Sequence, residues 1–296
     1  MSAGANQCPP EKGVALQVLG SGGPIADDGR ASAAYLVWVD GKSRILIDVG
    51  GGTFLRFGEA GASFRDLDFI GLSHFHADHS ADFIALLKSG NFSGRQRALI
   101  VTGPDGSGPF PGLNEFLKQL LDNDGGAFGY LSGYLDGTRG LPKLAAFEID
   151  SENVGAVTVL GDRDGPMHIE AMHVPHGIVP ALAFRVIIGD NKIVFASDQN
   201  GNLAQFVEFT GNASILVMHM PVPEGVTGAG RNLHAPPSVI GQIASDSNAE
   251  MLVLSHFMER SLRQLDQNVG SVRSNFSGPI ELATDLGCYQ LAETDD

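Results

Sequence analysis

Three histidines and an aspartate lie within six residues of one another in Ser73–His79, which reads Ser-His-Phe-His-Ala-Asp-His. A mainly apolar run precedes this segment directly and has the composition of a buried strand. In an extended chain, His74 and His76 project to the same side, and a turn after them would bring Asp78 and His79 to face the same point. Imidazole nitrogens and carboxylate oxygens are typical zinc ligands. The spacing therefore predicts a metal-binding loop at the end of a strand.

Three further candidate ligands stand at the ends of apolar, strand-like runs: His176, Asp198 and His256. Side chains at the ends of neighbouring strands can enter a shared edge, and an aspartate can bridge two metal ions. Asp48 ends another apolar strand, and two roles are open for it. It could cap the helix that follows or brace the glycine turn, or it could support the metal loop through hydrogen bonds.

Short strands and helices must position these residues. We expect two groups of strands, each followed by helices, which favours a sandwich with helices on its outer faces. Helices are expected over Ala81–Lys88 and Leu113–Leu121, and the Gly-rich segment 122–140 is expected to be irregular. No internal repeat or linker is evident, so we predict one domain over residues 1–296, with a substrate cap around residues 103–143.

Four segments together resemble the metallo-β-lactamase superfamily: SHFHADH, VPHG, ASDQ and LSHF, in this order. The resemblance runs from about residue 14 to residue 267. It implies an αββα sandwich of the α/β (α+β) class with a two-metal site at one edge. It also implies two Zn²⁺ ions, with Mn²⁺ or Fe open for one position. By motif position, the first ion would be held by His74, His76 and His176, the second by Asp78, His79 and His256, and both by Asp198. His173 is an alternative to His176.

The run after His176 and the single aspartate at position 198 resemble the ribonuclease Z-like branch of this superfamily. The sequence departs from the nucleases of that branch after the metal motif, where Ser80–Phe83 replaces a glycine-containing run. It also has His219-Met220-Pro221 where the nuclease carries a His-Glu pair. The segments RASAAYLVWVDGK, DVGGGTFLRFGEAGA and HADHSADF look like the secreted arylsulfatases of the superfamily.

This closer resemblance implies a dinuclear zinc hydrolase that uses a metal-bridging hydroxide to cleave aryl sulfate esters, with phosphodiesters as a further open substrate class. The alternatives are a phosphodiesterase or tRNA 3′-processing endonuclease of the ribonuclease Z type, and a lactonase. Asp78 could accept a hydrogen bond from the attacking water as well as bind metal. His234 is the candidate general acid, because the nuclease branch has a catalytic histidine at a similar position. Arg231 and Arg260 are candidates for holding the substrate anion, with Arg30 a weaker one; His168, His173 and His219 are expected to be structural.

The acidic composition of the chain bears on which kind of molecule it could bind. The 296 residues carry 19 Lys and Arg against 34 Asp and Glu, which gives a net charge of −15. Nucleic-acid affinity rests largely on basic residues that neutralise phosphates. Nucleic acid is therefore not the expected partner, and the resemblance to arylsulfatases implies a small anionic ester as substrate. No apolar stretch is long enough to span a membrane, and a homodimer is left open.

The two cysteines, Cys8 and Cys288, stand near opposite ends of the chain. Chain termini often lie close together, so a disulfide between them and two separate thiols are both open. Met1–Glu11 has no apolar core and is not an intact signal peptide. The arylsulfatase resemblance implies a periplasmic or secreted protein, with the cytoplasm as the alternative.

Overall fold

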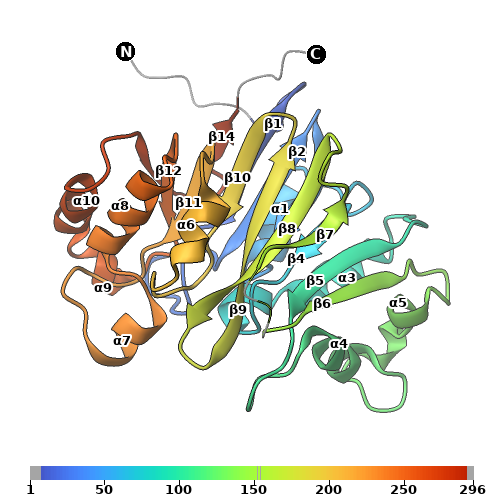
Figure 1. Cartoon of the computed structure of the whole chain (residues 1–296). Helices are drawn as coiled ribbons and strands as arrows, with labels where there is room; N and C mark the ends of the chain where they lie inside the picture. Colours follow the sequence, from blue (N-terminus) through green and yellow to red (C-terminus); the bar gives the residue numbers. More distant parts are fainter. Residues whose placement is uncertain (1–7, 152, 154, 292–296) are drawn as a thin grey trace.

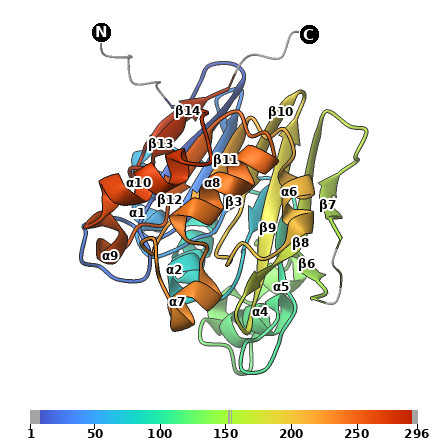
Figure 2. The ribbon, with the colours of Figure 1, turned by 60° about the vertical axis from the view of Figure 1, so that its left-hand side comes forward.

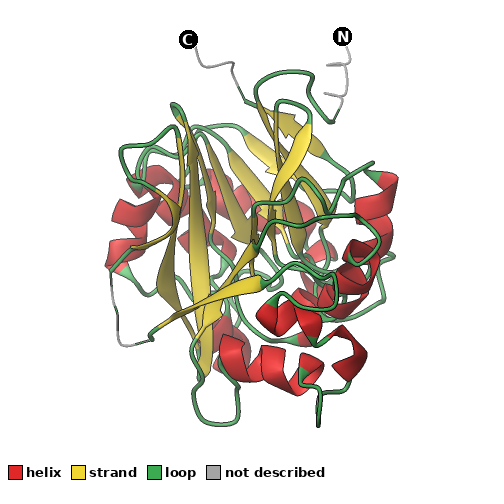
Figure 3. Ribbon diagram, turned by 90° about the vertical axis from the view of Figure 1, so that its right-hand side faces the viewer, coloured by secondary structure: helices red, strands yellow, loops and turns green. Residues whose placement is uncertain are grey.

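The computed structural model describes residues 8–151, 153 and 155–291. Two seven-stranded mixed sheets face each other, and helices cover their outer faces (Figures 1 and 3). This arrangement confirms the predicted α/β class and the αββα sandwich.

The first sheet has the strand order β14-β1-β2-β3-β4-β5-β6. β1 to β3 pair antiparallel, whereas β3 to β6 are parallel. Its strands, in chain order, are β1 Val14–Gly20, β2 Ala34–Val39, β3 Lys42–Ile47, β4 Phe69–Gly71, β5 Leu99–Pro104, β6 Leu144–Ile149 and β14 Cys288–Gln290.

The second sheet has the order β13-β12-β11-β10-β9-β8-β7. The long β8–β9 hairpin is antiparallel, and β10 to β13 are parallel. Its strands are β7 Val157–Gly161, β8 Met167–His176, β9 Val179–Ile188, β10 Asn191–Phe195, β11 Ile215–His219, β12 Leu252–Ser255 and β13 Ile280–Leu282.

The helices form two outer layers. Those against the first sheet are α1 Thr53–Glu59, α2 Ala77–Ser80, α3 Phe83–Gly90, α4 Leu113–Leu121, a 3-10 turn at Gly129–Leu131 and α5 Gly133–Asp136. Those of the second half are α6 Ala204–Thr210, α7 Gly228–Leu233, α8 Pro237–Asp246, α9 Glu259–Leu262 and α10 Leu265–Arg273.

Two apolar cores follow from the alternation of side chains along the strands. In β1, Leu16 and Val18 face the core between the sheets, whereas Ala15 and Leu19 face the helices of the first layer. Phe69 of the first sheet contacts Phe184 of the second, with ring centroids 5.9 Å apart. Both faces of the central strands are covered by apolar contacts. These contacts hold the strand ends in place, and the candidate ligands lie at or just after those ends.

The structure differs from the expected helix over Ala81–Lys88. The chain instead forms α2, breaks, and continues as α3, because the Asp82 carboxylate accepts hydrogen bonds from the backbone N–H groups of Gly52 and Phe54, at 2.8 and 2.9 Å. Asp82 therefore joins the start of α1 to the metal loop, a contact between segments distant in sequence that periodicity does not encode.

The segment 122–140 is less irregular than expected, because it contains the 3-10 turn and α5. Tyr134 is buried there, and its hydroxyl donates to the backbone carbonyl of Leu87, at 2.7 Å. The proposed cap, 103–143, thus packs largely into the helical layer. Its contact with the site is the ring of Phe110, whose centroid lies 5.9 Å from that of His76. The division of the chain into one domain with a substrate cap around residues 103–143 remains a prediction.

A disulfide joins Cys8 to Cys288, with the Cα atoms 5.9 Å apart. Of the two possibilities that the sequence left open, the structure therefore has the bonded one. Among the described residues, no helix is long and apolar enough to cross a membrane.

Candidate metal centre

The candidate ligands meet at one edge of the sandwich, where strands of both sheets end. His74 and His76 follow β4, and His176 ends β8. Asp198 follows β10, and His256 follows β12. All but His76 are almost completely buried.

Two groups of ligand atoms lie within 4.8 Å of one another and share Asp198. The first contains His74, His76, His176 and Asp198. The second contains His79, Asp198, His219 and His256. Both groups could hold a metal ion, since each offers at least three imidazole nitrogens and a carboxylate.

Asp78 lies beside the second group. Its Oδ2 is 3.2 Å from Nε2 of His256 and 3.6 Å from Nε2 of His79. All seven residues that the sequence singled out as ligands are therefore brought to one place. Their assignment to particular ions is a proposal, which we develop below.

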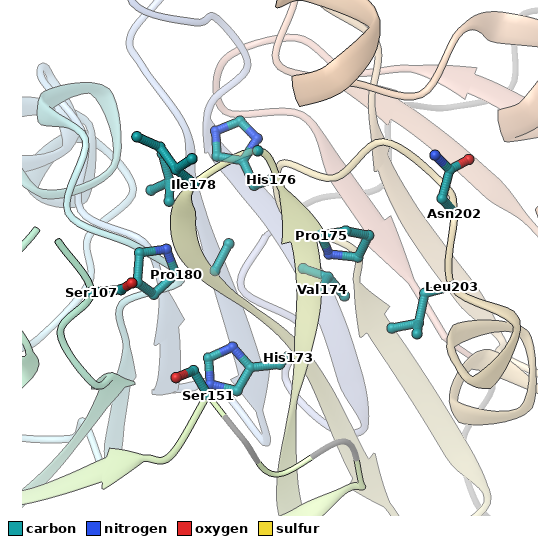
Figure 4. A pocket seen from close by; sticks show the side chains of 13 residues that line it. Ser107, Ser151, His173, Val174, Pro175, His176, Ile178, Pro180, Asn202 and Leu203 are labelled. Atoms are coloured by element: carbon teal, nitrogen blue, oxygen red, sulfur yellow. The ribbon is translucent and has the colours of Figure 1, made fainter.

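His176, and not His173, faces the other ligands. The two residues are three positions apart on β8, so their side chains leave opposite faces of the strand. Figure 4 shows His173 near Ser151 and His176 at the end of the hairpin. His173 Nε2 lies 3.3 Å from the carbonyl oxygen of Ile149, and burial lowers its pKa.

The donor set fits a metal, because some imidazole nitrogens at the site are buried and have no hydrogen-bond partner among the described residues. His176 Nδ1 donates to the carbonyl of Leu233, at 2.9 Å, and its buried Nε2 has no hydrogen-bond partner. Nε2 of His74 and Nδ1 of His76 lie 3.0 Å apart. Two nitrogens bound to one tetrahedral zinc stand about 3.4 Å apart, so this spacing is close to that of a ligand pair.

Charge in the site also suits a cation. Burial lowers the pKa of His74 well below its usual value, so this imidazole is neutral. Burial raises the pKa of Asp78, but the hydrogen bond with His256 and the nearby charges outweigh it and lower the pKa to about 2. Asp198 is ionised for the same kind of reason, with several histidines around it. Neutral imidazoles and ionised carboxylates are the forms that bind metal.

Asp48 braces the metal loop. Its Oδ1 accepts from the backbone N–H of Ser73, at 2.7 Å, and its Oδ2 accepts from the Ser73 hydroxyl and from Nδ1 of His79, both at 2.8 Å. This fixes the tautomer of His79 with Nε2 toward the centre. Burial lowers the pKa of His79, but Asp48 outweighs it and raises the pKa to about 9. A bound cation would have to replace that proton. Asp48 does not cap α1, which has no side-chain cap.

His219 was expected to be structural, and the structure places it directly behind the shared ligand. Its Nδ1 lies 2.7 Å from Oδ1 of Asp198, and its Nε2 lies 2.8 Å from the hydroxyl of Tyr35. Burial and His256 lower the pKa of His219 to about 3, so it is neutral. Since a carboxylate only accepts, Nδ1–H donates to Asp198, and Nε2 lies against the Tyr35 hydroxyl, which also bonds the Ser255 hydroxyl at 2.9 Å. His219 therefore orients Asp198. Its position at the end of β11 was the available signal.

A cavity of about 420 Å³ opens beside the ligands, and residues of α2 and α7 line it. Figure 2 shows these two helices next to each other. Asp78, Asp198, His234 and Arg260 are among its lining residues. Arg260 is held there by its Nε, which donates to the carbonyl of Pro221, at 2.8 Å.

His234 lies in this cavity, with Nδ1 3.8 Å from Oδ1 of Asp198. Burial lowers its pKa to about 4, although Asp198 acts in the opposite direction. The side chain is therefore neutral at pH 7 without substrate, and it offers an imidazole N–H instead of an imidazolium proton.

Arg231 does not line the cavity. Its guanidinium donates to the carbonyl of Asn200, at 2.7 Å, and to Oδ1 of Asn202, at 3.2 Å. The expected role in holding the substrate anion is not supported, because these bonds direct the side chain to a neighbouring loop. Arg30 likewise donates to the Ser21 hydroxyl and the Ala283 carbonyl, at 2.7 and 3.0 Å.

Comparisons with known proteins agree with this geometry. The model of the family described as Anti-Pycsar protein Apyc1 matches residues 14–271. Ribonuclease Z of Mycobacterium marinum is 26% identical over 284 residues, which cover 92% of this chain and 97% of that protein. Ribonuclease Z of Archaeoglobus fulgidus is also 26% identical, over 90% of this chain and 94% of its own length.

Solved structures share the fold. Human tRNase Z, short form, aligns with a TM-score of 0.71 at 19% identity, and covers 94% of this chain and 99% of its own. The metallo-β-lactamase fold protein YhfI from Bacillus subtilis gives 0.69 at 21% identity, with the same coverage. Yeast PDE1 gives 0.65 at 11% identity, over 95% of this chain and 100% of its own.

These findings confirm the metallo-β-lactamase fold and the ribonuclease Z-like homologues. They give no support to the closer resemblance to arylsulfatases. They also weigh against the expectation that nucleic acid is an unlikely partner, because the relatives named ribonuclease Z and tRNase Z act on RNA by their names.

Proposed function

The chain belongs to the Anti-Pycsar protein Apyc1 family, and on this basis we propose that it is a metal-dependent hydrolase of phosphodiesters. The observation that carries the proposal is the pair of ligand groups that share Asp198 and border an open cavity. Two-metal sites of this kind suit displacement at a phosphoryl centre, where charge must be stabilised on several oxygens.

The ligand assignment follows the two groups, except that Asp78 replaces His219 in the second, because both ring nitrogens of His219 already lie against other side chains, Asp198 and Tyr35. His74, His76 and His176 would hold one ion, Asp78, His79 and His256 the other, and Asp198 both, with Zn²⁺ as the metal best suited to this donor set and Mn²⁺ or Fe open for one position. When bound, such a pair supplies Lewis-acid activation of water near neutral pH and neutralisation of phosphoryl charge.

The other side chains complete the reaction. Asp78 has a carboxylate oxygen at the cavity and can accept a hydrogen bond from the attacking water, which orients a lone pair toward phosphorus. His234 can donate an N–H to the leaving oxygen, and the negative charge of a bound substrate would raise its pKa toward the range of a general acid. Arg260 offers its remaining guanidinium donors to the phosphate oxygens.

A phosphodiester is favoured over an aryl sulfate because the relatives named ribonuclease Z, and yeast PDE1 among the structures, point to phosphate esters. A small substrate is favoured over tRNA by the cavity of about 420 Å³, a usual size for small-molecule sites. Residues 103–164 also carry four Lys and Arg against ten Asp and Glu, which disfavours a polyanion there.

The second candidate is an endonuclease that processes tRNA 3′ ends. It is favoured by the ribonuclease Z relatives, which align along nearly their whole length. An aryl sulfate and a lactone are also included among the test substrates, because the metal ligands by themselves do not exclude the hydrolysis of either.

The test is a substrate panel with metal analysis on the purified chain. We expect about two zinc ions per chain, cleavage of bis-p-nitrophenyl phosphate, and loss of both metal and activity in Asp198→Asn. His173→Gln is the matched control, since His173 lies on the same hairpin but faces away from the ligands. Turnover of p-nitrophenyl sulfate without any phosphodiester cleavage would overturn the proposal, and faster cleavage of a precursor tRNA would favour the endonuclease.

Compartment and assembly remain part of this proposal. The Cys8–Cys288 disulfide supports an oxidising location, the periplasm or the exterior, over the cytoplasm. A homodimer is proposed on the exposure of Phe54, Leu55 and Phe92, which border one apolar depression. Light scattering would measure the molar mass directly.

A further inference from the structure

A basic cavity lies at the edge of the first sheet opposite to the metal centre. It has a volume of about 390 Å³ and is lined by three segments, residues 42–44, 65–66 and 94–97. These segments come just before or at the start of the parallel strands β3, β4 and β5, whereas the metal loop follows the end of β4. His74 comes six positions after Asp68, which corresponds to roughly 20 Å of extended chain.

The charge of this cavity is opposite to that of the chain. Five basic side chains gather there, and two carboxylates face them, so the cluster has a net charge of +3 in a chain of −15. The members are Lys42, Arg44, Arg65, Arg95 and Arg97, with Asp66 and Asp68.

Three of the five cations have structural partners. Arg44 pairs with Asp68 at 2.5 Å, and Arg97 pairs with the same carboxylate. Arg95 is buried, and its guanidinium donates to the backbone carbonyls of Arg65, Arg97 and Ala98 at 2.6 to 3.0 Å. Burial and the neighbouring Arg97 lower the pKa of Arg95 to about 10, so it stays charged at neutral pH. These contacts build the floor of the cavity.

The two others, Lys42 and Arg65, are exposed at its rim. In the part of the chain that the structure describes, neither side chain has an ion-pair partner. Their donors are available to a ligand, and the fixed guanidinium groups behind them add attraction without having to be ordered on binding. A guanidinium fork and an ammonium suit phosphate oxygens.

We propose that this cavity is a second, non-catalytic site for a small anion that bears two phosphate groups. One phosphate group would contact Arg65 and the other Lys42, across the floor formed by Arg44, Arg95 and Arg97. The volume suits a small molecule, and three excess positive charges match a bisphosphate better than a single monovalent anion. The site is independent of the proposed hydrolase activity, because its residues and those of the metal centre lie at opposite ends of the strands.

The test is calorimetric titration of the metal-loaded full chain with propane-1,3-diol bisphosphate, a weak chelator, at low ionic strength. We expect two binding events in the wild type, one at the metal centre and one at the cavity. The double variant Lys42→Gln, Arg65→Gln should weaken the cavity event at least about tenfold, because two of the five cations are lost, and leave the other event unchanged. Its melting temperature should not change, since neither side chain has a partner to lose.

The matched control is Lys118→Gln, Lys143→Gln, which removes two exposed charges elsewhere and gives the same net charge. It should keep both events. A wild type with one event, or a control that weakens the second event as much as the double variant does, would overturn the proposal, because binding would then follow the metal centre alone or the overall charge of the chain.

Discussion

The hydroxyl of Tyr35 lies 2.8 Å from Nε2 of His219, and this contact links the two sheets directly behind the metal centre. Tyr35 belongs to β2 of the first sheet and His219 to β11 of the second. The other nitrogen of His219 lies 2.7 Å from Asp198, which both ligand groups share. A hydroxyl buried in one sheet thus fixes the orientation of a carboxylate supplied by the other.

The first prediction concerns this contact. Tyr35→Phe removes the hydroxyl that lies against the buried Nε2 of His219 and donates to Ser255, and we expect about 1–3 kcal/mol of lost stability because buried polar groups lose their partner. Because Asp198 is then less well oriented, zinc affinity should fall about tenfold, toward the lower end of the effect of losing such a partner. Chelator competition measures the affinity, and thermal unfolding measures the stability.

Tyr134→Phe is the control for that variant. Its hydroxyl is also buried, but it donates to the Leu87 carbonyl in the helical layer. It should lose similar stability and keep its zinc affinity. If both variants lose zinc equally, the tyrosine acts only through the fold.

The second prediction concerns Asp48. In Asp48→Asn, the amide NH₂ would face donors on Ser73 and His79, so at least one of the three hydrogen bonds to the carboxylate is lost. We expect zinc affinity to fall by about 10- to 100-fold. Elemental analysis after dialysis should show the second ion lost before the first, since Asp48 bonds His79 directly. Retention of both ions would show that the loop needs no brace.

The third prediction concerns His234. If it donates to the leaving oxygen, His234→Ala should slow poor leaving groups much more than p-nitrophenolate, by about 10²- to 10⁴-fold for the poorest. The plot of log kcat against leaving-group pKa would therefore become steeper than in the wild type. An unchanged slope with a raised KM would instead assign His234 to substrate binding.

The fourth prediction concerns the disulfide, which joins residues 280 positions apart. Cys8→Ser, Cys288→Ser should lower the free energy of unfolding by about 2–4 kcal/mol, since the unfolded chain gains freedom. Activity at low temperature should be unchanged, because neither cysteine touches the metal centre. Denaturant unfolding of the oxidised wild type, reduced wild type and double variant measures this. The last two should coincide, and a reduced wild type as stable as the oxidised form would contradict it.

Much of the site could be predicted because each ligand segment ends or follows an apolar strand, and strand ends meet at an edge. The same reasoning could not find the role of His219, since this depends on Tyr35, 184 residues away, and on the tautomer that Asp198 imposes. The contacts of Arg231 could not be foreseen for a similar reason, because its guanidinium bonds the loop at Asn200 and Asn202; its role in holding a substrate anion stays a prediction.

The fold followed from periodicity where one face of an element is buried, as in Leu113–Leu121, which is helical as expected. Periodicity could not predict the fold where a tertiary hydrogen bond sets the end of an element. Asp82, which lies between α2 and α3, is the example. The basic cavity was also not foreseen, because its members come from three separate segments and none has a sequence motif.

The ligands come from both halves of the chain: His74, His76, Asp78 and His79 from the first, and His176, Asp198 and His256 from the second. Bound ions would therefore act as a cross-link between the two half-sandwiches. Pulling the halves apart would require metal–ligand bonds to break together with the apolar contacts between the sheets. Resistance to mechanical force and to proteolysis should then depend on metal occupancy, and the same centre that performs the chemistry would hold the two sheets in register.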